Sequence, residues 1–155
     1  MATIRVQQAD FDIGAELAAV SAGRTDIGGI GCFVGTVRGD GGDRAIAAML
    51  LEHYPGMTER AMARIAAQAE QRWALLGCTL IHRVGRLTPG ETIVCVLAAA
   101  AHRQAALDAT AFLIDWLKTR APFWKKEIFT DGGEVWVEAH ATDEDSAARW
   151  DENTP

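Results

Sequence analysis

The sequence predicts an α+β fold with a largely antiparallel sheet and two long helices. Stretches with the period-2 alternation of β-strands follow one another in pairs, and two long stretches with helical periodicity lie between the pairs. Strands that are consecutive in sequence favour antiparallel pairing, whereas a doubly wound fold alternates strand and helix. The 155 residues contain no linker, repeat or low-complexity segment, so a single domain covering 1–155 is expected.

The first third of the chain contains short elements and a glycine-rich strand. Residues 3–7 alternate as an edge strand, and residues 12–21 carry a modest helical pattern. In the stretch 28–39 the glycines indicate bulges or close backbone approach. A flexible loop at 39–44 separates this strand from the next one, at 45–54, and the two strands are expected to form a hairpin.

The three cysteines of the chain lie in apolar, strand-like surroundings. Alternation in the glycine-rich strand places Ile30, Cys32 and Val34 on one face. Together with Cys78 and Cys95, Cys32 is expected to be a buried, reduced thiol of a cytoplasmic protein. A catalytic cysteine is the less favoured alternative. A metal site is not expected, because no cysteine or histidine pair has ligand spacing.

Two long helices are predicted in the middle and later parts of the chain, each with an apolar stripe. The first runs from Pro55 to about Trp73, with a stripe of Met57, Ala61, Met62 and Ile65. The second spans 103–119 and ends before Pro122. Its stripe comprises Leu107, Ala111, Ile114 and Leu117, widened by Leu113 and Trp116.

Two hairpins and a short helix complete the predicted elements. Strands at 78–85 and 91–100 flank the turn sequence TPGE, and strands at 123–129 and 134–140 flank TDGG. An acidic helix at 143–150 follows. These strands supply the pairs on which the antiparallel prediction depends.

The charge balance restricts the partners of the protein. The formal net charge is −6, which disfavours nucleic acid and anionic membranes, because both require a broad basic face. The N-terminus lacks the apolar core of a signal peptide, and no apolar run is long enough to span a bilayer, so a cytoplasmic location is expected. An anion site must then be local and built from a few converging cations.

Cations gather in one segment, LKTRAPFWKKE, around an apolar centre. Lys118 falls in the last turn of the second long helix, and Lys125 falls in the strand that follows. Lys125 and Lys126 are neighbours on a strand and point to opposite faces, so at most one of them shares a pocket with Lys118. Phe123 and Trp124 diverge in the same way, which makes one a core anchor and the other a candidate pocket wall.

Two other cationic positions are candidates for anion binding. His102 and Arg103 open the second long helix, where free backbone N–H groups and the helix dipole favour an anion. The pair fits a phosphate cradle, and a capping role is equally consistent with the sequence. Arg38 ends the glycine-rich strand, where an exposed arginine is ordinarily just solvated.

Five blocks of the sequence together resemble the large, catalytic subunit of molybdopterin synthase. The blocks are FVGTVR, LEHYPGM, IHRVG, AHR and LKTRAPFWKKE, which occur in the order of that family and span most of residues 28–140. The resemblance implies a fold of the α/β-hammerhead type. It also implies transfer of sulfur to cyclic pyranopterin monophosphate, which gives the dithiolene of molybdopterin, and no cofactor is expected.

The resemblance implies partners and residue roles as well. The sulfur would arrive as a thiocarboxylate on the C-terminal Gly-Gly of a small ubiquitin-like subunit, and the large subunits would form a homodimer within a heterotetramer. Lys118 and Lys125 match the family's catalytic lysines. The residues implied to bind substrate are Arg38, His102, Arg103, Lys126 and Glu127.

One geometric expectation does not depend on the resemblance. Arg103 and Lys118 are 15 residues apart on one predicted helix, or about 22 Å at 1.5 Å per residue. A pterin-sized site cannot easily touch both ends, so a composite site is expected. In it His102 and Arg103 of one subunit face Arg38, Lys118 and Lys125 of the other. The alternatives are a phosphate-binding module without catalysis, a scaffold for a ubiquitin-like protein, and a cysteine-based sulfurtransferase.

Overall fold

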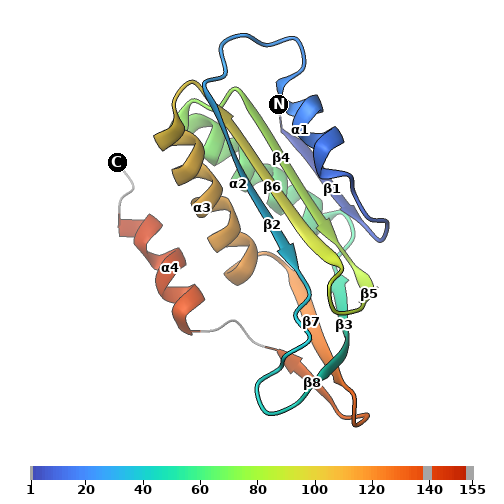
Figure 1. The fold of residues 1–155 in the computed structure, drawn as a ribbon. Helices are drawn as coiled ribbons and strands as arrows, with labels where there is room; N and C mark the ends of the chain where they lie inside the picture. Colours follow the sequence, from blue (N-terminus) through green and yellow to red (C-terminus); the bar gives the residue numbers. More distant parts are fainter. Residues whose placement is uncertain (1, 138–140, 153–155) are drawn as a thin grey trace.

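A computed structural model describes residues 2–137 and 141–152, and the α+β prediction is confirmed (Figure 1). In chain order the described elements are β1 (Thr3–Gln7), α1 (Ile13–Ser21), β2 (Gly29–Thr36), β3 (Ile46–His53), α2 (Met57–Trp73), β4 (Gly77–Arg83), β5 (Gly85–Leu87), β6 (Thr92–Ala100), α3 (Arg103–Thr119), β7 (Phe123–Phe129), β8 (Glu134–Val137) and α4 (Ala141–Glu152).

The described strands form two sheets. Sheet 1 has the order β1-β4-β6-β2, and sheet 2 has the order β5-β3-β7-β8. Among these strands β1 and β4 pair in parallel, and the other pairs are antiparallel. Helices α2 and α3 cover one face of sheet 1, α1 covers part of the other face, and α4 packs against α3 (Figure 1).

The expected hairpin between 28–39 and 45–54 is wrong, because β2 and β3 belong to different sheets. The loop between them is closed by a bridge between Asp40 and Ala45, and the Ile46 amide donates to the Gly39 carbonyl at 3.0 Å. This closed loop carries the chain from sheet 1 into sheet 2. Strand β5 was not predicted, since three residues are too few to show alternation.

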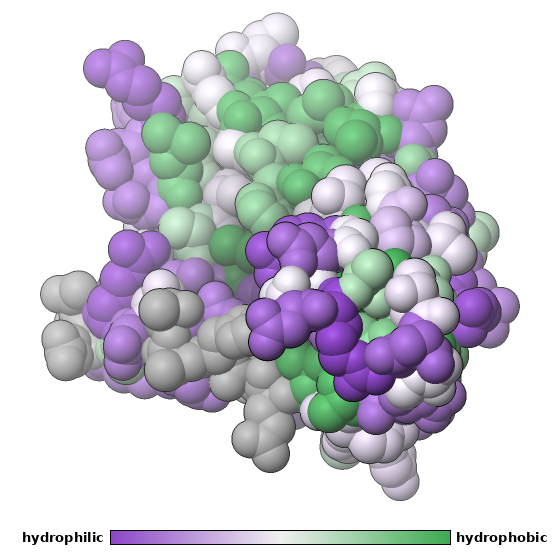
Figure 2. Space-filling model, turned by 60° about the horizontal axis from the view of Figure 1, so that its bottom comes forward, coloured by the Kyte–Doolittle hydropathy of each residue, from purple (hydrophilic) through white to green (hydrophobic). Residues whose placement is uncertain are grey.

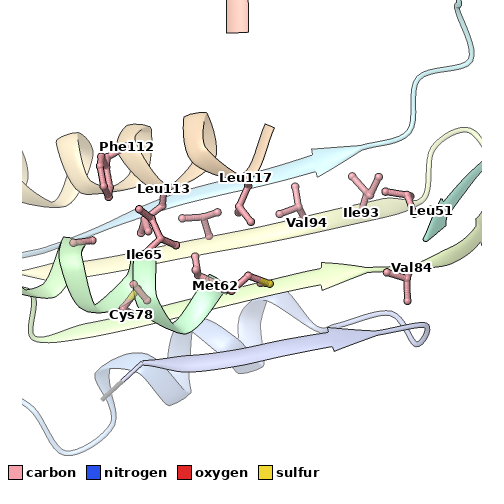
Figure 3. Packing of buried hydrophobic residues seen from close by; sticks show 14 of the residues in the cluster. Leu51, Met62, Ile65, Cys78, Val84, Ile93, Val94, Phe112, Leu113 and Leu117 are labelled. Atoms are coloured by element: carbon pink, nitrogen blue, oxygen red, sulfur yellow. The ribbon is translucent and has the colours of Figure 1, made fainter. Parts of the chain in front are cut away.

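The main core lies between sheet 1 and the two long helices (Figure 3). Met62 and Ile65 of α2 and Leu113 and Leu117 of α3 point toward the same layer as Val94 of β6. Complete burial of one such side chain contributes roughly 1.5–3 kcal/mol. This core fixes α3 on the sheet and thereby determines where its last turn, which carries Lys118, lies.

The predicted helix stripes are partly wrong. Leu107 is 59% exposed and Met57 is 42% exposed. On α3 the buried positions include Ala106 and Thr110, because Gly31 of β2 lies so close that a side chain there would overlap Thr110. Because this glycine has no side chain, α3 can approach β2 closely with the face that carries Ala106 and Thr110. The pattern of large apolar residues does not identify this face as the buried one.

Cys32 is exposed, which corrects the expectation that all three cysteines are buried. Strand β2 is the last strand of sheet 1, and α1 packs mainly on β4 and β6. Cys78 and Cys95 are buried as expected. Burial raises the pKa of the Cys78 thiol to about 12 and that of Cys95 to about 11, and it also raises the pKa of Cys32. None of the three is an activated thiolate.

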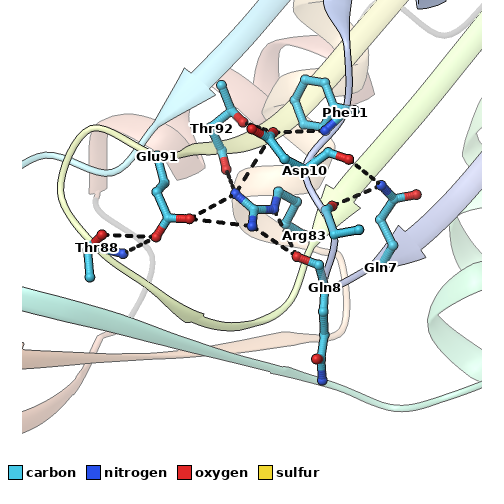
Figure 4. Close-up of polar contacts among 9 residues, drawn as sticks. Gln7, Gln8, Asp10, Phe11, Arg83, Thr88, Glu91 and Thr92 are labelled. Atoms are coloured by element: carbon cyan, nitrogen blue, oxygen red, sulfur yellow. Dashed lines mark hydrogen bonds and ion pairs between the residues drawn. The ribbon is translucent and has the colours of Figure 1, made fainter.

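Arg83 ties the end of β1 to the hairpin of β4 and β6 (Figure 4). Its guanidinium donates to the Gln8 carbonyl at 2.9 Å and to the Thr92 carbonyl at 2.9 Å, and it contacts the Glu91 carboxylate at 3.4 Å. Arg83 is only 7% exposed, and a charged side chain that is buried in this way needs hydrogen-bond partners. The arginine of the IHRVG block therefore has a structural role in this fold.

At the C-terminal end of the described residues, β8 completes sheet 2 and α4 follows it. Strand β8 ends at Val137, and the predicted strand residues 138–140, including His140, lie outside the described residues. Helix α4 is confirmed, and Trp150 holds it to α3 by donating from its indole nitrogen to Asp115 at 2.8 Å. This contact places the last turn of α4 beside the C-terminal half of α3, where Arg120 also pairs with Asp151.

Candidate functional site

A hollow of about 590 Å³ opens where the end of β2, the end of α3 and the inner face of sheet 2 meet. Its polar lining includes Thr36, Arg38, Asp40, His82, Lys118, Thr119, Lys125, Glu127 and Asp143. Its apolar lining includes Phe33, Met49, Leu51, Ile93 and Phe123. Three cations from three separate elements of an acidic protein therefore converge on one cavity, as a local anion site requires.

Lys118 reaches the hollow from the last turn of α3. The pKa of Lys118 is lowered, first because burial penalises its charged form and then because Lys125 and Arg38 are near. Asp143 of α4 opposes this effect. The side chain still has access to solvent, so this ammonium is both reachable and held in an unfavourable environment when no anion is bound.

Strand β7 presents alternate residues to the hollow, as its sequence predicted. Phe123, Lys125 and Glu127 line the cavity, whereas Trp124 is 48% exposed on the other face. The Lys126 ammonium also lies on the outer face, 3.2 Å from a carboxylate oxygen of Glu134. Lys125 thus shares the pocket with Lys118, and within this chain Lys126 does not.

Arg38 follows β2 and lies at the hollow with Thr36. Its side chain forms no ion pair with the described residues. An arginine in this position keeps its donors free for an anion, and its planar fork suits a phosphate or a carboxylate.

His102 and Arg103 lie at the opposite end of α3 from Lys118, outside the hollow. Helix α3 runs without a break from Arg103 to Thr119, so the predicted separation of the two ends along one helix is confirmed. The His102 side chain makes no capping hydrogen bond, which disfavours the capping alternative. The exposed amides and cations at this end remain suited to an anion.

His82 also lines the hollow and was not among the predicted site residues. It is 8% exposed and stacks on Phe123, with ring centroids 3.9 Å apart and an interplanar angle of 21°. The signal in the sequence was a titratable residue directly after the apolar pair Leu80 and Ile81 in β4, a strand whose residues are buried on both faces. Such a residue needs a partner or a function.

A second hollow, of about 530 Å³, lies among α2, α3 and α4 and is lined by aromatic and arginine side chains that include Phe112, Trp116 and Trp150. It contains no lysine. Within the described ranges no group of three His, Cys, Asp or Glu residues is placed to hold a metal ion. None of the described helices is long and apolar enough to cross a membrane.

The fold and the first hollow together define an α+β protein with a cavity lined by converging cations. Residues 6–120 match the model of the MoaE protein family. The chain is 56% identical to a molybdopterin synthase catalytic subunit of Mesorhizobium japonicum, over 96% of this chain and 92% of the relative. It is equally identical to the catalytic subunit of Pseudomonas aeruginosa, over 96% and 99% of the two chains.

A solved structure gives the same result for the fold. The molybdopterin biosynthesis MoaE protein of Burkholderia ambifaria superposes with a TM-score of 0.83 at 52% identity, over 97% of this chain and 99% of that chain. The chain therefore belongs to the MoaE family, that of the molybdopterin synthase catalytic subunits. The resemblance read from the five sequence blocks is confirmed.

Proposed function

We propose that this chain is the catalytic subunit of a molybdopterin synthase, which transfers sulfur from a thiocarboxylate to cyclic pyranopterin monophosphate. The sulfur donor is the C-terminal Gly-Gly tail of a small ubiquitin-like subunit. Family membership supports the general activity, sulfur transfer in molybdenum cofactor biosynthesis. The observation that carries the assignment of the site is the convergence of Arg38, Lys118 and Lys125 on one hollow.

The chemistry requires cations at this place. A thiocarboxylate is an anion, and its sulfur forms a bond to a carbon atom of the substrate while a C–O bond at that carbon breaks and the oxygen substituent leaves. The sulfur remains on the substrate only when water breaks the bond between sulfur and the acyl carbon, which leaves the tail as a carboxylate. Negative charge develops on the acyl oxygen in that step, and an ammonium beside it stabilises the transition state. We assign this role to Lys118, with Lys125 as the second catalytic lysine.

The remaining residues of the site hold the substrate in this proposal. Arg38 and Glu127 line the hollow and would contact the pterin or its phosphate. His102 and Arg103 would bind the phosphate from a second subunit, because α3 separates them from the hollow of their own chain. Lys126 lies on the outer face of β7, so any contact that it makes with substrate must also come from an assembled form.

The open edge of β2 supports a homodimer with a composite site. Strand β2 begins beside α3's N-terminus, where Gly29 pairs with Ala100, and it ends at the hollow with Thr36. Two copies paired antiparallel along this edge would place the start of one β2, with His102 and Arg103, beside the hollow of the other. Figure 2 shows hydrophobic residues gathered in the upper part of the view, and an apolar patch of this kind suits a subunit interface.

Reconstitution tests the function. The purified chain is mixed with cyclic pyranopterin monophosphate and a small subunit that carries a C-terminal thiocarboxylate, and dithiolene product is measured. A small subunit that ends in an ordinary carboxylate is the control. Product that depends on the thiocarboxylate supports the proposal, and its absence with an active donor refutes it.

A further inference from the structure

One polar atom in the hollow has no role in the proposed function so far. His82 comes from β4, on the floor of the cavity, and its Nδ1 lies 2.8 Å from the backbone carbonyl oxygen of Arg83. A carbonyl only accepts, so Nδ1 carries the proton and the neutral ring keeps its lone pair on Nε2. Among the described residues nothing donates to Nε2.

The surroundings keep this ring neutral. The pKa of His82 is lowered to about 4, chiefly because burial penalises the charged ring. The contact with the Arg83 carbonyl opposes this shift, and the charges of Lys118, Lys125 and His53 add to it. Stacking on Phe123 fixes the plane of the ring. The result is a rigid hydrogen-bond acceptor, more than nine-tenths buried, at a position where the neighbouring cations are donors only.

A peptide tail that enters this hollow needs such an acceptor. Its terminal anion is matched by the lysines, but its backbone N–H groups lose water as they enter, and an unpaired buried N–H is costly. Glu127 and Asp143 also accept hydrogen bonds, yet both are only partly buried and so serve the mouth of the cavity better than its floor. His82 provides the acceptor on the floor.

We propose that His82 is a positioning residue whose Nε2 accepts a hydrogen bond from a backbone N–H of the small subunit's C-terminal tail. This inference rests on the proposed function, in which that tail enters the hollow. The bond fixes how far the tail penetrates and so brings its thiocarboxylate to Lys118 and Lys125. Because this role concerns the tail's backbone, it applies to the carboxylate form of the tail as well.

Two substitutions distinguish the role of Nε2 as an acceptor from the role of Nδ1, which donates to the Arg83 carbonyl. In His82→Asn the side-chain amide can still donate to the Arg83 carbonyl, but nothing remains at the position of Nε2. In His82→Gln the longer side chain can place its oxygen near the position of Nε2. Both variants lose the stacking on Phe123, so the pair compares a side chain that keeps the donor to the Arg83 carbonyl with one that keeps an acceptor near the position of Nε2. Thermal unfolding of each variant checks that the two folds are comparable.

The affinity of the small subunit, with an ordinary carboxylate terminus, is measured by calorimetry with its full tail and with the last two glycines removed. We expect His82→Asn to weaken binding of the full tail about tenfold, which corresponds to ~1.4 kcal/mol. We expect His82→Gln to recover most of this loss, and neither variant to change binding of the shortened partner.

Other outcomes overturn the inference. Equal affinity of wild type and His82→Asn for the full tail means that Nε2 does not bind it. Equal losses with both tails mean that the histidine is only structural. A loss of substrate affinity without a loss of tail affinity assigns Nε2 to the pterin instead. If the wild-type chain itself does not distinguish the full tail from the shortened one, the proposed tail site fails, whatever the variants do.

Discussion

Lys118 and Lys125 reach the same hollow from α3 and β7, and the charge of Lys125 contributes to lowering the pKa of Lys118. Two ammonium groups in one partly buried cavity repel each other when it is empty. An anion bound between them relieves that repulsion, so the arrangement favours an anionic reactant over a neutral one.

The first prediction concerns this coupling. Removing the second charge in Lys125→Ala should raise the pKa of Lys118, because one cause of its lowering is gone while burial remains. The measurement is a pH titration of the lysine side-chain NMR signals. Arg64→Ala, which removes an exposed cation of α2 away from the hollow, should leave the Lys118 titration unchanged. A Lys118 pKa that does not move in Lys125→Ala would show that the two charges are not coupled.

The second prediction concerns acid stability. The unfolded chain protonates His82 near its ordinary pKa of 6.5, whereas the folded chain does so only near 4. The unfolded state therefore binds more protons in this range, and the free energy of unfolding should fall as the pH drops from 6.5 towards 4. The full shift corresponds to about 3 kcal/mol. Urea unfolding of wild type and His82→Gln at neutral and acid pH isolates this contribution, and an equal loss in both proteins would contradict it.

The third prediction concerns the glycines of β2. A Cβ on Gly31 would overlap Thr110 and lie 2.5 Å from the Ala106 carbonyl oxygen, whereas on Gly29 its nearest neighbour would be Arg103 Cα at 3.6 Å. Gly31→Ala should therefore destabilise the fold by about 1–3 kcal/mol through displacement of α3. Gly29→Ala, on the same strand, should change stability by less than about 0.5 kcal/mol. Similar urea midpoints for the two variants would refute the close packing.

The fourth prediction concerns the composite site. A mixed dimer of an Arg103→Ala chain and a Lys118→Ala chain, isolated with two different tags, contains one intact site if the site draws on both subunits. It should regain about half of the wild-type activity, although each variant alone is inactive or nearly so. If each site lies within one chain, both sites of the mixed dimer are damaged and no activity returns.

Local sequence signals were sufficient for the helices and for much of the site. The apolar stripe between His102 and Pro122 gave the bounds of α3, and strand alternation correctly predicted that only one of Lys125 and Lys126 shares the hollow with Lys118. These features depend on neighbours in the sequence, and neighbours fix helix periodicity and side-chain direction.

Features that depend on distant contacts were not predicted. The division into two sheets separates β2 from β3, and it follows from how β3 packs with β7 rather than from the loop between the strands. The exposure of Cys32 follows from the edge position of β2. The place of His82 in the hollow was not predicted, because its neighbours Lys118 and Phe123 are far away in sequence and meet it only in the fold.

The central claim is that the hollow performs sulfur transfer and that Lys118 is essential to it. The most direct test is a single-turnover reaction of the chain with cyclic pyranopterin monophosphate and a thiocarboxylated small subunit, in wild type and in Lys118→Ala. We predict dithiolene product from the wild type and a rate about 10²–10³-fold lower in the variant, with partner binding retained. Unchanged turnover in Lys118→Ala would favour a binding module, and partner binding without product in the wild type would leave a scaffold.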